Sequence, residues 1–108
     1  MALLSESLRM RRDLADRTGV AGGLESVAAV QSAREGHGRA ARLLGAAARL
    51  REDAPAPLSP AERAITDAAL ASVRFALGDE AFEAAWAEGR AMTLEQAVAY
   101  ALDEEPPA

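Results

Sequence analysis

Cysteine, lysine and asparagine are absent from this sequence of 108 residues, and histidine occurs only once. Without cysteine the protein has neither a disulfide framework nor a thiolate metal site. No stretch reaches about 18 apolar residues without a charge, the length that a membrane-spanning helix needs. Charged side chains follow the apolar start at residues 1–4 too closely for a secretory signal. We therefore expect a cytoplasmic protein.

Signals for β-strands are also lacking. There is no run of alternating valine, isoleucine, threonine or aromatic residues, and only 4% of the residues are aromatic. Alanine, the strongest helix former, supplies 28 of the 108 residues. Because alanine buries little area, the larger side chains must form the core. The composition predicts an all-α fold, in one domain or in a fragment of a larger protein.

Six helices are predicted from the spacing of apolar residues. The pair Thr18-Gly19 is expected to end the first helix. Gly36 and Gly38 are expected to supply the positive φ angles of a turn after the second. Gly89 is expected to end the fifth. The predicted helices span residues 2–17, 20–34, 39–52, 60–77, 79–88 and 94–102.

Two capping boxes predict where helices begin. Ser59 with Glu62, followed by a proline at the first helical position, opens the fourth helix. Thr93 with Gln96 opens the sixth in the same way. Gly78 is expected to end the fourth helix as a left-handed cap.

The inward faces of these helices predict the core. Phe82 and Trp86 are spaced for one helix face, which favours burial, although such a pair can also serve as an exposed anchor for a partner. The predicted core residues are Leu24, Val27, Leu44, Ile65, Val73, Phe82, Trp86, Leu94 and Val98.

Charge is divided unevenly along the chain. Residues 1–52 hold nine arginines and six acidic residues, a net charge of +3, whereas residues 53–108 hold three arginines and eleven acidic residues, a net charge of −8. The acidic half disfavours an approach to nucleic acid. The division is compatible with docking between halves or subunits, but two ordinary solvated surfaces are the favoured interpretation.

The second and third predicted helices form a hairpin of tetratricopeptide length, over roughly residues 21–54. The first predicted helix then corresponds to the second helix of a preceding, truncated repeat. Because a repeat must stack on a neighbour to bury its apolar face, its N-terminal flank is expected to bind a partner. This partner is either the remainder of a longer protein or a second copy of the chain, which would form a homodimer. The interaction residues predicted on this flank are Leu4, Leu8, Arg11 and Arg12.

A family resemblance rests on three segments. They are AARLLGAAARLRE (residues 40–52), LSPAER (58–63) and LGDEAFEAAWAEGRAMTLEQAVAYAL (77–102). Together they resemble the C-terminal end of large bacterial transcriptional regulators of the LuxR or antibiotic-regulatory type. Such proteins join a DNA-binding domain, a signal-transduction ATPase domain and a tetratricopeptide-like array. Neither a phosphate-binding loop nor a DNA-reading domain occurs in this sequence, so the resemblance implies only an interaction or sensing role.

The expected organisation follows from the repeat and from this resemblance. Tetratricopeptide-like antiparallel helices occupy residues 1–53, and a proline-rich linker occupies 54–60. A three-helix C-terminal cap occupies 61–102, and a polar tail occupies 103–108. Such a cap suits the end of a helical array, which needs a polar closing unit.

Candidates for chemistry are few. His37 lies between glycines, where a solvated turn residue is expected, and no nucleophile motif accompanies it. The acidic residues at 79, 80, 83 and 88 are compatible with a cation site, but acids are also favourable at a helix N-terminus. We therefore predict no enzyme activity, metal or cofactor. The basic N-terminal half has arginines suited to phosphate but no interleaved aromatic residues. These arginines are Arg9, Arg11, Arg12, Arg39, Arg42, Arg49 and Arg51.

Three functions remain in view. The first is a non-catalytic protein-interaction or scaffold module, the C-terminal piece of a bacterial transcriptional regulator, which self-associates and has no membrane partner. The second is a regulator that acts directly through nucleic acid or a nucleotide. The third is a small-molecule sensor with a pocket between the helices.

Overall fold

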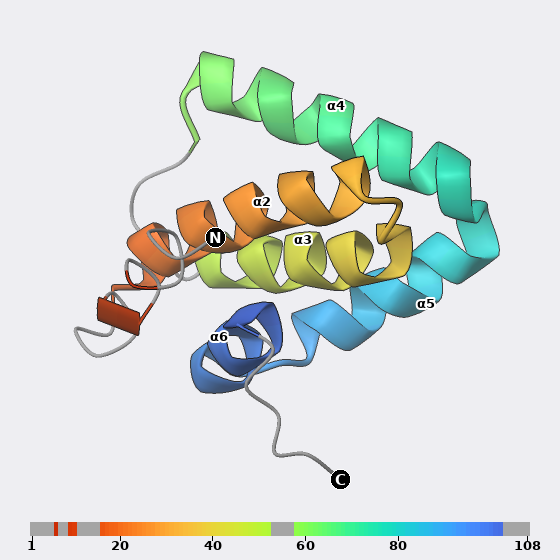
Figure 1. Ribbon diagram of the computed structural model, residues 1–108. Coiled ribbons are helices and arrows are strands. Elements are labelled where there is room, and N and C mark those ends of the chain that lie inside the picture. The colour runs from red at the N-terminus through yellow and green to blue at the C-terminus, as the bar shows by residue number, and fades with distance from the viewer. Residues whose placement is uncertain (1–5, 7–8, 11–15, 53–57, 103–108) are drawn as a thin grey trace, which may run out of the picture.

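The computed structural model describes residues 6, 9–10, 16–52 and 58–102, which form an all-helical fold (Figure 1). The all-α prediction is thereby confirmed. Most of the predicted first helix lies outside the described residues, and so do Leu4, Leu8, Arg11 and Arg12. No helix in the described part of the chain is long and apolar enough to cross a bilayer. The helices are α2 (Arg17–Ala33), α3 (His37–Glu52), α4 (Pro60–Leu77), α5 (Asp79–Arg90) and α6 (Leu94–Leu102).

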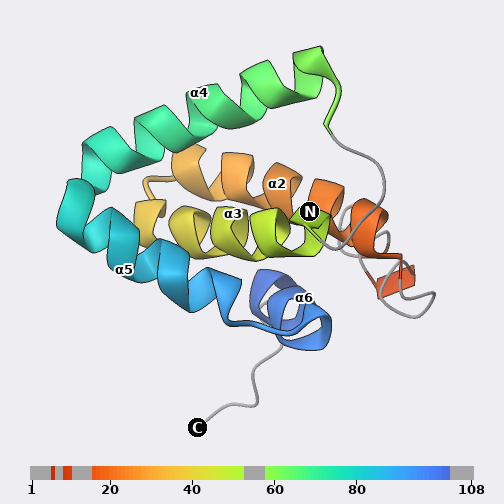
Figure 2. The same ribbon diagram turned by 180° about the vertical axis from the view of Figure 1, so that it is seen from behind.

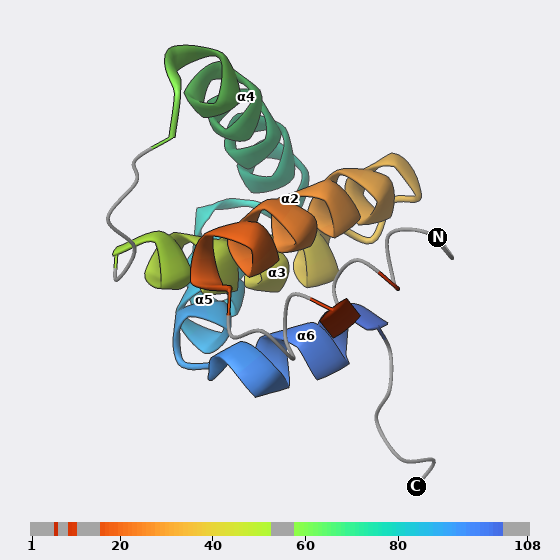
Figure 3. The ribbon, with the colours of Figure 1, turned by 90° about the vertical axis from the view of Figure 1, so that its left-hand side faces the viewer.

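Helix α3 lies at the centre of the fold. It runs antiparallel to α2 on one side and packs against α5 on another, and the short α6 crosses beneath the pair (Figures 1 and 2). Helix α4 lies on the opposite side of the α2–α3 pair from α6, at the edge of the molecule (Figure 3). Eight of the sixteen residues of α3 are buried: Ala40, Ala41, Leu43, Leu44, Gly45, Ala46, Ala47 and Leu50. This helix therefore provides the surface on which the other helices assemble.

Small residues let α3 and α5 approach each other backbone to backbone. A Cβ atom added at Gly45 would lie 2.4 Å from the carbonyl oxygen of Trp86. One added at Gly89 would lie 1.9 Å from the carbonyl oxygen of Arg42. The prediction that Gly89 ends its helix is therefore wrong, because α5 continues to Arg90 and Gly89 serves the crossing instead.

The buried side chains form one hydrophobic cluster with members from all five helices. Ile65 was expected in this core, but it is 71% exposed, so this prediction is wrong. Steps of four residues drift around a helix that has 3.6 residues per turn. Ile65 therefore lies well outside the inward stripe around Val73. Trp86 is only partly buried and packs at the edge of the cluster. The other expected core residues are buried: Leu24, Val27, Leu44, Val73, Phe82, Leu94 and Val98.

Helix α2 begins earlier than predicted. Asp16 caps it by accepting a hydrogen bond from the backbone N–H of Gly19, with 2.9 Å between the two atoms. The expected break at Thr18-Gly19 is therefore wrong. A side-chain cap satisfies backbone donors that the first helical turn leaves without a partner. The stability gained from this cap outweighs the weak helix propensity of Gly19.

The turn between α2 and α3 also differs from the prediction. Glu35 carries the positive φ angle, 64°, and neither Gly36 nor Gly38 does. The backbone N–H of Gly36 donates to the carbonyl of Gln31 over 2.7 Å, and that of Glu35 donates to Ser32 over 3.0 Å. These two bonds make a Schellman motif, with glutamate in the left-handed position that glycine usually takes. The turn closes at once, so His37 begins α3.

Candidate functional site: the groove between α4 and α5

A capping box fixes the start of α4. The Ser59 hydroxyl accepts a hydrogen bond from the N–H of Glu62 over 3.2 Å, and the Glu62 carboxylate accepts one from the N–H of Ser59 over 3.0 Å. The bond from the Ser59 backbone is the main cause of a lowered pKa of Glu62. This capping box was predicted from the sequence and is confirmed.

A single residue joins α4 to α5. Gly78 has a φ of 85°, in the region that side chains disfavour. Its N–H donates to the carbonyl of Arg74 over 2.8 Å, and its own carbonyl accepts from the N–H of Phe82 over 2.9 Å. Gly78 therefore takes part in the backbone hydrogen bonding of both helices, and α5 turns back sharply from α4 (Figure 1).

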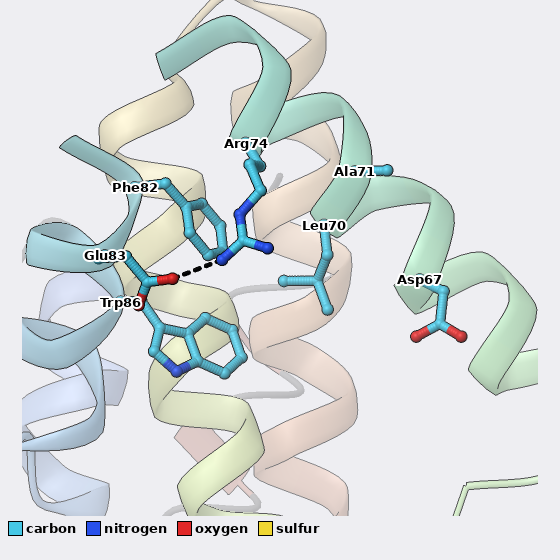
Figure 4. Close-up of a pocket in the computed structure, with 7 residues that line it drawn as sticks. All are labelled: Asp67, Leu70, Ala71, Arg74, Phe82, Glu83 and Trp86. Carbon is cyan, nitrogen blue, oxygen red and sulfur yellow. Dashed lines mark hydrogen bonds and ion pairs between the residues drawn. The ribbon is translucent and has the colours of Figure 1, made fainter. Parts of the chain in front are cut away.

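The angle between these two helices encloses an open groove with a volume of about 490 Å³. Figure 4 shows side chains from both helices that line it. We call it the α4–α5 groove, and its lining residues are Asp67, Leu70, Ala71, Arg74, Phe82, Glu83 and Trp86.

Aromatic rings form the apolar part of the α4–α5 groove. Phe82 and Trp86 stack with ring centroids 5.7 Å apart and an interplanar angle of 24°. Phe82 is buried, whereas Trp86 is only partly covered and faces the groove (Figure 4). Leu70 supplies the facing wall from α4. Each of the two interpretations of the aromatic pair therefore holds for one residue. Phe82 is a core residue, and Trp86 offers an accessible ring.

Arg74 closes one side of the groove with charge. Its guanidinium group lies 4.6 Å from the centroid of the Phe82 ring, a cation–π contact. It forms an ion pair with Glu83, and a longer one with Asp79, 3.6 Å from Nε to Oδ1. On α3, Arg42 approaches Glu88 at 3.6 Å. Three acids of the suspected cation cluster thus have arginine partners. Among the described residues, no group of three or more acidic or histidine side chains is placed to hold a metal ion.

The lining of the groove combines apolar and polar groups. Its polar groups are the carboxylates of Asp67 and Glu83, the guanidinium of Arg74 and the indole N–H of Trp86. An apolar slot with a charged rim is the usual composition of a site that receives an apolar side chain from a partner.

The remaining candidate residues lie elsewhere. His37 was expected to be a solvated turn residue, but it is half-buried at the start of α3 and does not line the α4–α5 groove. Its Nδ1 atom is buried and makes no hydrogen bond within the described part of the chain.

Arginines of the basic half make contacts within the fold. Arg51 forms a two-pronged ion pair with Glu25, with both nitrogen–oxygen distances at 2.8 Å, and this hydrogen bonding raises the pKa of Arg51. Arg42 donates to the Tyr100 hydroxyl over 3.3 Å, which raises the pKa of Arg42. Arg39 lies 4.3 Å from the centroid of the Tyr100 ring. These three arginines therefore join α2, α3 and α6 and do not form a free phosphate-binding patch.

The sequence pattern indicates one wall of the groove and not the other. It singled out Phe82 and Trp86 but not Leu70, Ala71 or Asp67 on α4. A usable signal was the single glycine at position 78. Two helices joined by one residue with a positive φ must lie at an angle, so the aromatic pair near the start of α5 faces the last turns of α4.

The described helices form an all-α fold with an open, partly apolar groove between α4 and α5. The chain is 37% identical over 83 residues to proteins of Mycobacterium bovis and of Mycobacterium tuberculosis strains CDC 1551 and H37Rv. Their names assign them provisionally to the HTH-type transcriptional regulators. The match covers 77% of this chain but only 9% of each relative. No protein-family profile and no solved structure matches the chain.

Proposed function

We propose that the protein is a non-catalytic protein-interaction module that acts as the C-terminal piece of a bacterial transcriptional regulator in the cytoplasm. The observation that carries the proposal is the α4–α5 groove. Its partly covered Trp86 and its wall residue Leu70 offer an apolar slot, and the ion pairs of Arg74 frame it with fixed charge. Aromatic anchors inside a charged rim are the usual centre of a protein–protein contact.

A tetratricopeptide-like role for α2 and α3 is part of this proposal. The two helices are antiparallel and pack along their length. The residues that occupy the bulky and small positions of the proposed repeat are buried: Leu24, Val27, Ala28, Ala40, Leu44 and Ala47. Support for the link to a regulator comes from the relatives, which are HTH-type regulators by name and about ten times longer than the matched segment.

A binding titration tests the proposal. The probe is the part of the M. tuberculosis H37Rv relative that lies outside the matched 83 residues, produced as a separate protein. Trp86 is the single tryptophan of the chain. Its emission is therefore a reporter in the groove when the probe is chosen or engineered to lack tryptophan. We expect a saturable blue shift of this emission, because a partner in the groove removes water from the ring.

Two variants sharpen the titration. Leu70→Asp places a charge on the apolar wall and should weaken binding at least about tenfold. Ala84→Asp, on the exposed side of α5, should leave binding unchanged. Equal effects of the two variants, or no binding at all, would contradict the proposal. Salt-sensitive binding of a duplex DNA fragment without binding of the protein probe would favour the alternative of direct action on nucleic acid.

A further inference from the structure

Helix α4 has a second apolar side that faces away from the core. We call it the outer face of α4. Its residues are Ala61, Ala64, Ile65, Ala68, Ser72, Phe75 and Ala76, and every one of them is exposed. Ile65 is 71% exposed and Phe75 is 91% exposed.

This face carries no charge over its whole length. The ionisable residues of α4 are Glu62, Arg63, Asp67 and Arg74, and none of them belongs to the outer face. A helix that is apolar on both its inner and its outer side normally has a covering on each of them. Contiguous exposed apolar surface of this kind marks an interaction site. We therefore expect the outer face of α4 to bind a partner whose contact surface is also uncharged.

The order of side chains on this face is symmetric about position 70. Ile65 and Phe75 lie five residues to either side of that position, and Ala68 and Ser72 lie two residues to either side. In an isologous contact the same patch meets itself through a twofold axis. An antiparallel second α4, with the axis near position 70, would place Phe75 of each copy against Ile65 of the other. The small residues between them would allow the two helices to approach closely.

We propose that the outer face of α4 pairs with the same face of a second copy of this chain, as an antiparallel helix pair. This inference rests on the self-association named in our first functional hypothesis and specifies its surface. Charge selects this face over the others as a contact between two copies. Each copy carries a net charge of −5, so contacts through acidic surfaces such as α5, with Glu80, Glu83 and Glu88, would repel. The uncharged outer face lets two acidic chains meet without facing carboxylates.

The size of this surface sets the strength of the pair. A helix of 18 residues is about 27 Å long and about 10 Å across, a footprint of roughly 270 Å². Stable complexes bury about 800 Å² on each partner. We therefore expect a concentration-dependent equilibrium between monomer and dimer.

Sedimentation equilibrium of the full chain, from micromolar to millimolar concentration, tests the pairing. Phe75→Glu should weaken dimerisation at least about 100-fold, because two copies of the charge enter one apolar contact. Met10→Glu is the matched control, since Met10 is also a large exposed apolar residue, 64% exposed, and lies near the N-terminal flank. It should leave the dimer unchanged.

Each outcome of this comparison is decisive. A dimer lost in Met10→Glu but kept in Phe75→Glu would move self-association to the N-terminal flank and overturn the pairing through α4. A monomer at every concentration would overturn self-association altogether. The groove titration with Leu70→Asp would still test the wider function in either case.

Cross-linking tests the antiparallel register. The chain has no cysteine of its own, so Ala64→Cys and Ala76→Cys each add a single thiol. Positions 64 and 76 are symmetric about position 70. A mixture of the two variants should therefore form a mixed disulfide dimer under oxidation, and neither variant alone should do so. Disulfide dimers from Ala64→Cys alone would show parallel pairing and overturn the proposed arrangement.

Discussion

Two glycines at the crossing of α3 and α5 determine how closely the centre of the fold can pack. At Gly45 and Gly89 the backbone of the opposite helix occupies the place of a Cβ atom. Backbone atoms cannot move aside as the end of a flexible side chain can. Any side chain at these positions must therefore push two helices apart, and it would loosen the core around Ala41 and Ala85, which are both buried.

We predict that Gly89→Ala lowers the free energy of unfolding by about 1–3 kcal/mol, the usual cost of overpacking a core. Gly22→Ala is the control. Gly22 also lies within a helix, but its added Cβ would meet only the end of the Arg51 side chain, 3.9 Å away. That substitution should raise stability by about 0.5–1 kcal/mol. Urea unfolding followed by circular dichroism measures both, and a stabilising Gly89→Ala would refute the close crossing.

At the scale of the element, α4 depends on its ends more than the other helices do. It buries only Val73 fully, and Ala69, Leu70 and Leu77 pack partly against the core. A helix with so little burial gains a larger share of its stability from capping. The Ser59 capping box at one end and the Gly78 turn at the other therefore hold in place the wall of the α4–α5 groove.

We predict that Ser59→Ala destabilises the protein by about 1 kcal/mol at neutral pH, because a backbone donor of the first turn loses its acceptor.

The effect of Glu62→Ala should depend on pH. The folded-state pKa of Glu62 lies below its unfolded value, so its contribution is present above the unfolded pKa and disappears as pH falls through the folded pKa. Denaturant unfolding of both variants at neutral pH and at progressively more acidic pH measures this.

The difference between Glu62→Ala and wild type should accordingly shrink on acidification. Glu95→Ala on α6 is a suitable comparison, since Glu95 is also an exposed acid in the first turn of a helix that has a capping box, but the box there uses Gln96. A penalty for Glu62→Ala that stays constant down to the most acidic pH would show that its carboxylate does not act as the cap.

Local signals predicted the elements well where the controlling interaction is local. The two capping boxes and the end of α4 at Gly78 follow from residues within four positions of each other, and all three are confirmed. The role of Gly89 at the crossing of α3 and α5 could not be predicted from nearby residues. Its contact there is with the backbone of Arg42, which lies 47 positions away along the chain. The Leu70 wall of the groove was missed for the same reason, since the angle between α4 and α5 decides what faces Trp86.

At the scale of the whole molecule, α3 connects the two halves of the sequence. It packs against α2 on one side and against α5 on another, and it also contacts α4 and α6. Arg51 joins it to α2 through Glu25, and an ion pair between Arg90 and Glu52 joins it to the end of α5. The hydrophobic cluster therefore continues from the helices before residue 53 to those after residue 58.

We predict that the described helices unfold as one cooperative unit despite the proline-rich segment between α3 and α4. A single core with members from all five helices has no weak plane at which α2 and α3 could separate intact from α5 and α6. In urea, the emission of Trp86 on α5 and the ellipticity of all the helices should therefore give the same midpoint.

Leu24→Ala makes the test strict, because Leu24 is a fully buried residue of α2 and Trp86 lies on the far side of α3. The substitution should cost about 2–5 kcal/mol and shift both midpoints by the same amount. If the Trp86 transition stayed in place while the ellipticity shifted, residues 61–102 would be an independent unit, and the prediction of one cooperative unit would be wrong. In that case the α4–α5 groove would survive when the α2–α3 hairpin unfolds. Under a shared core, loss of the hairpin must abolish partner binding at the groove as well.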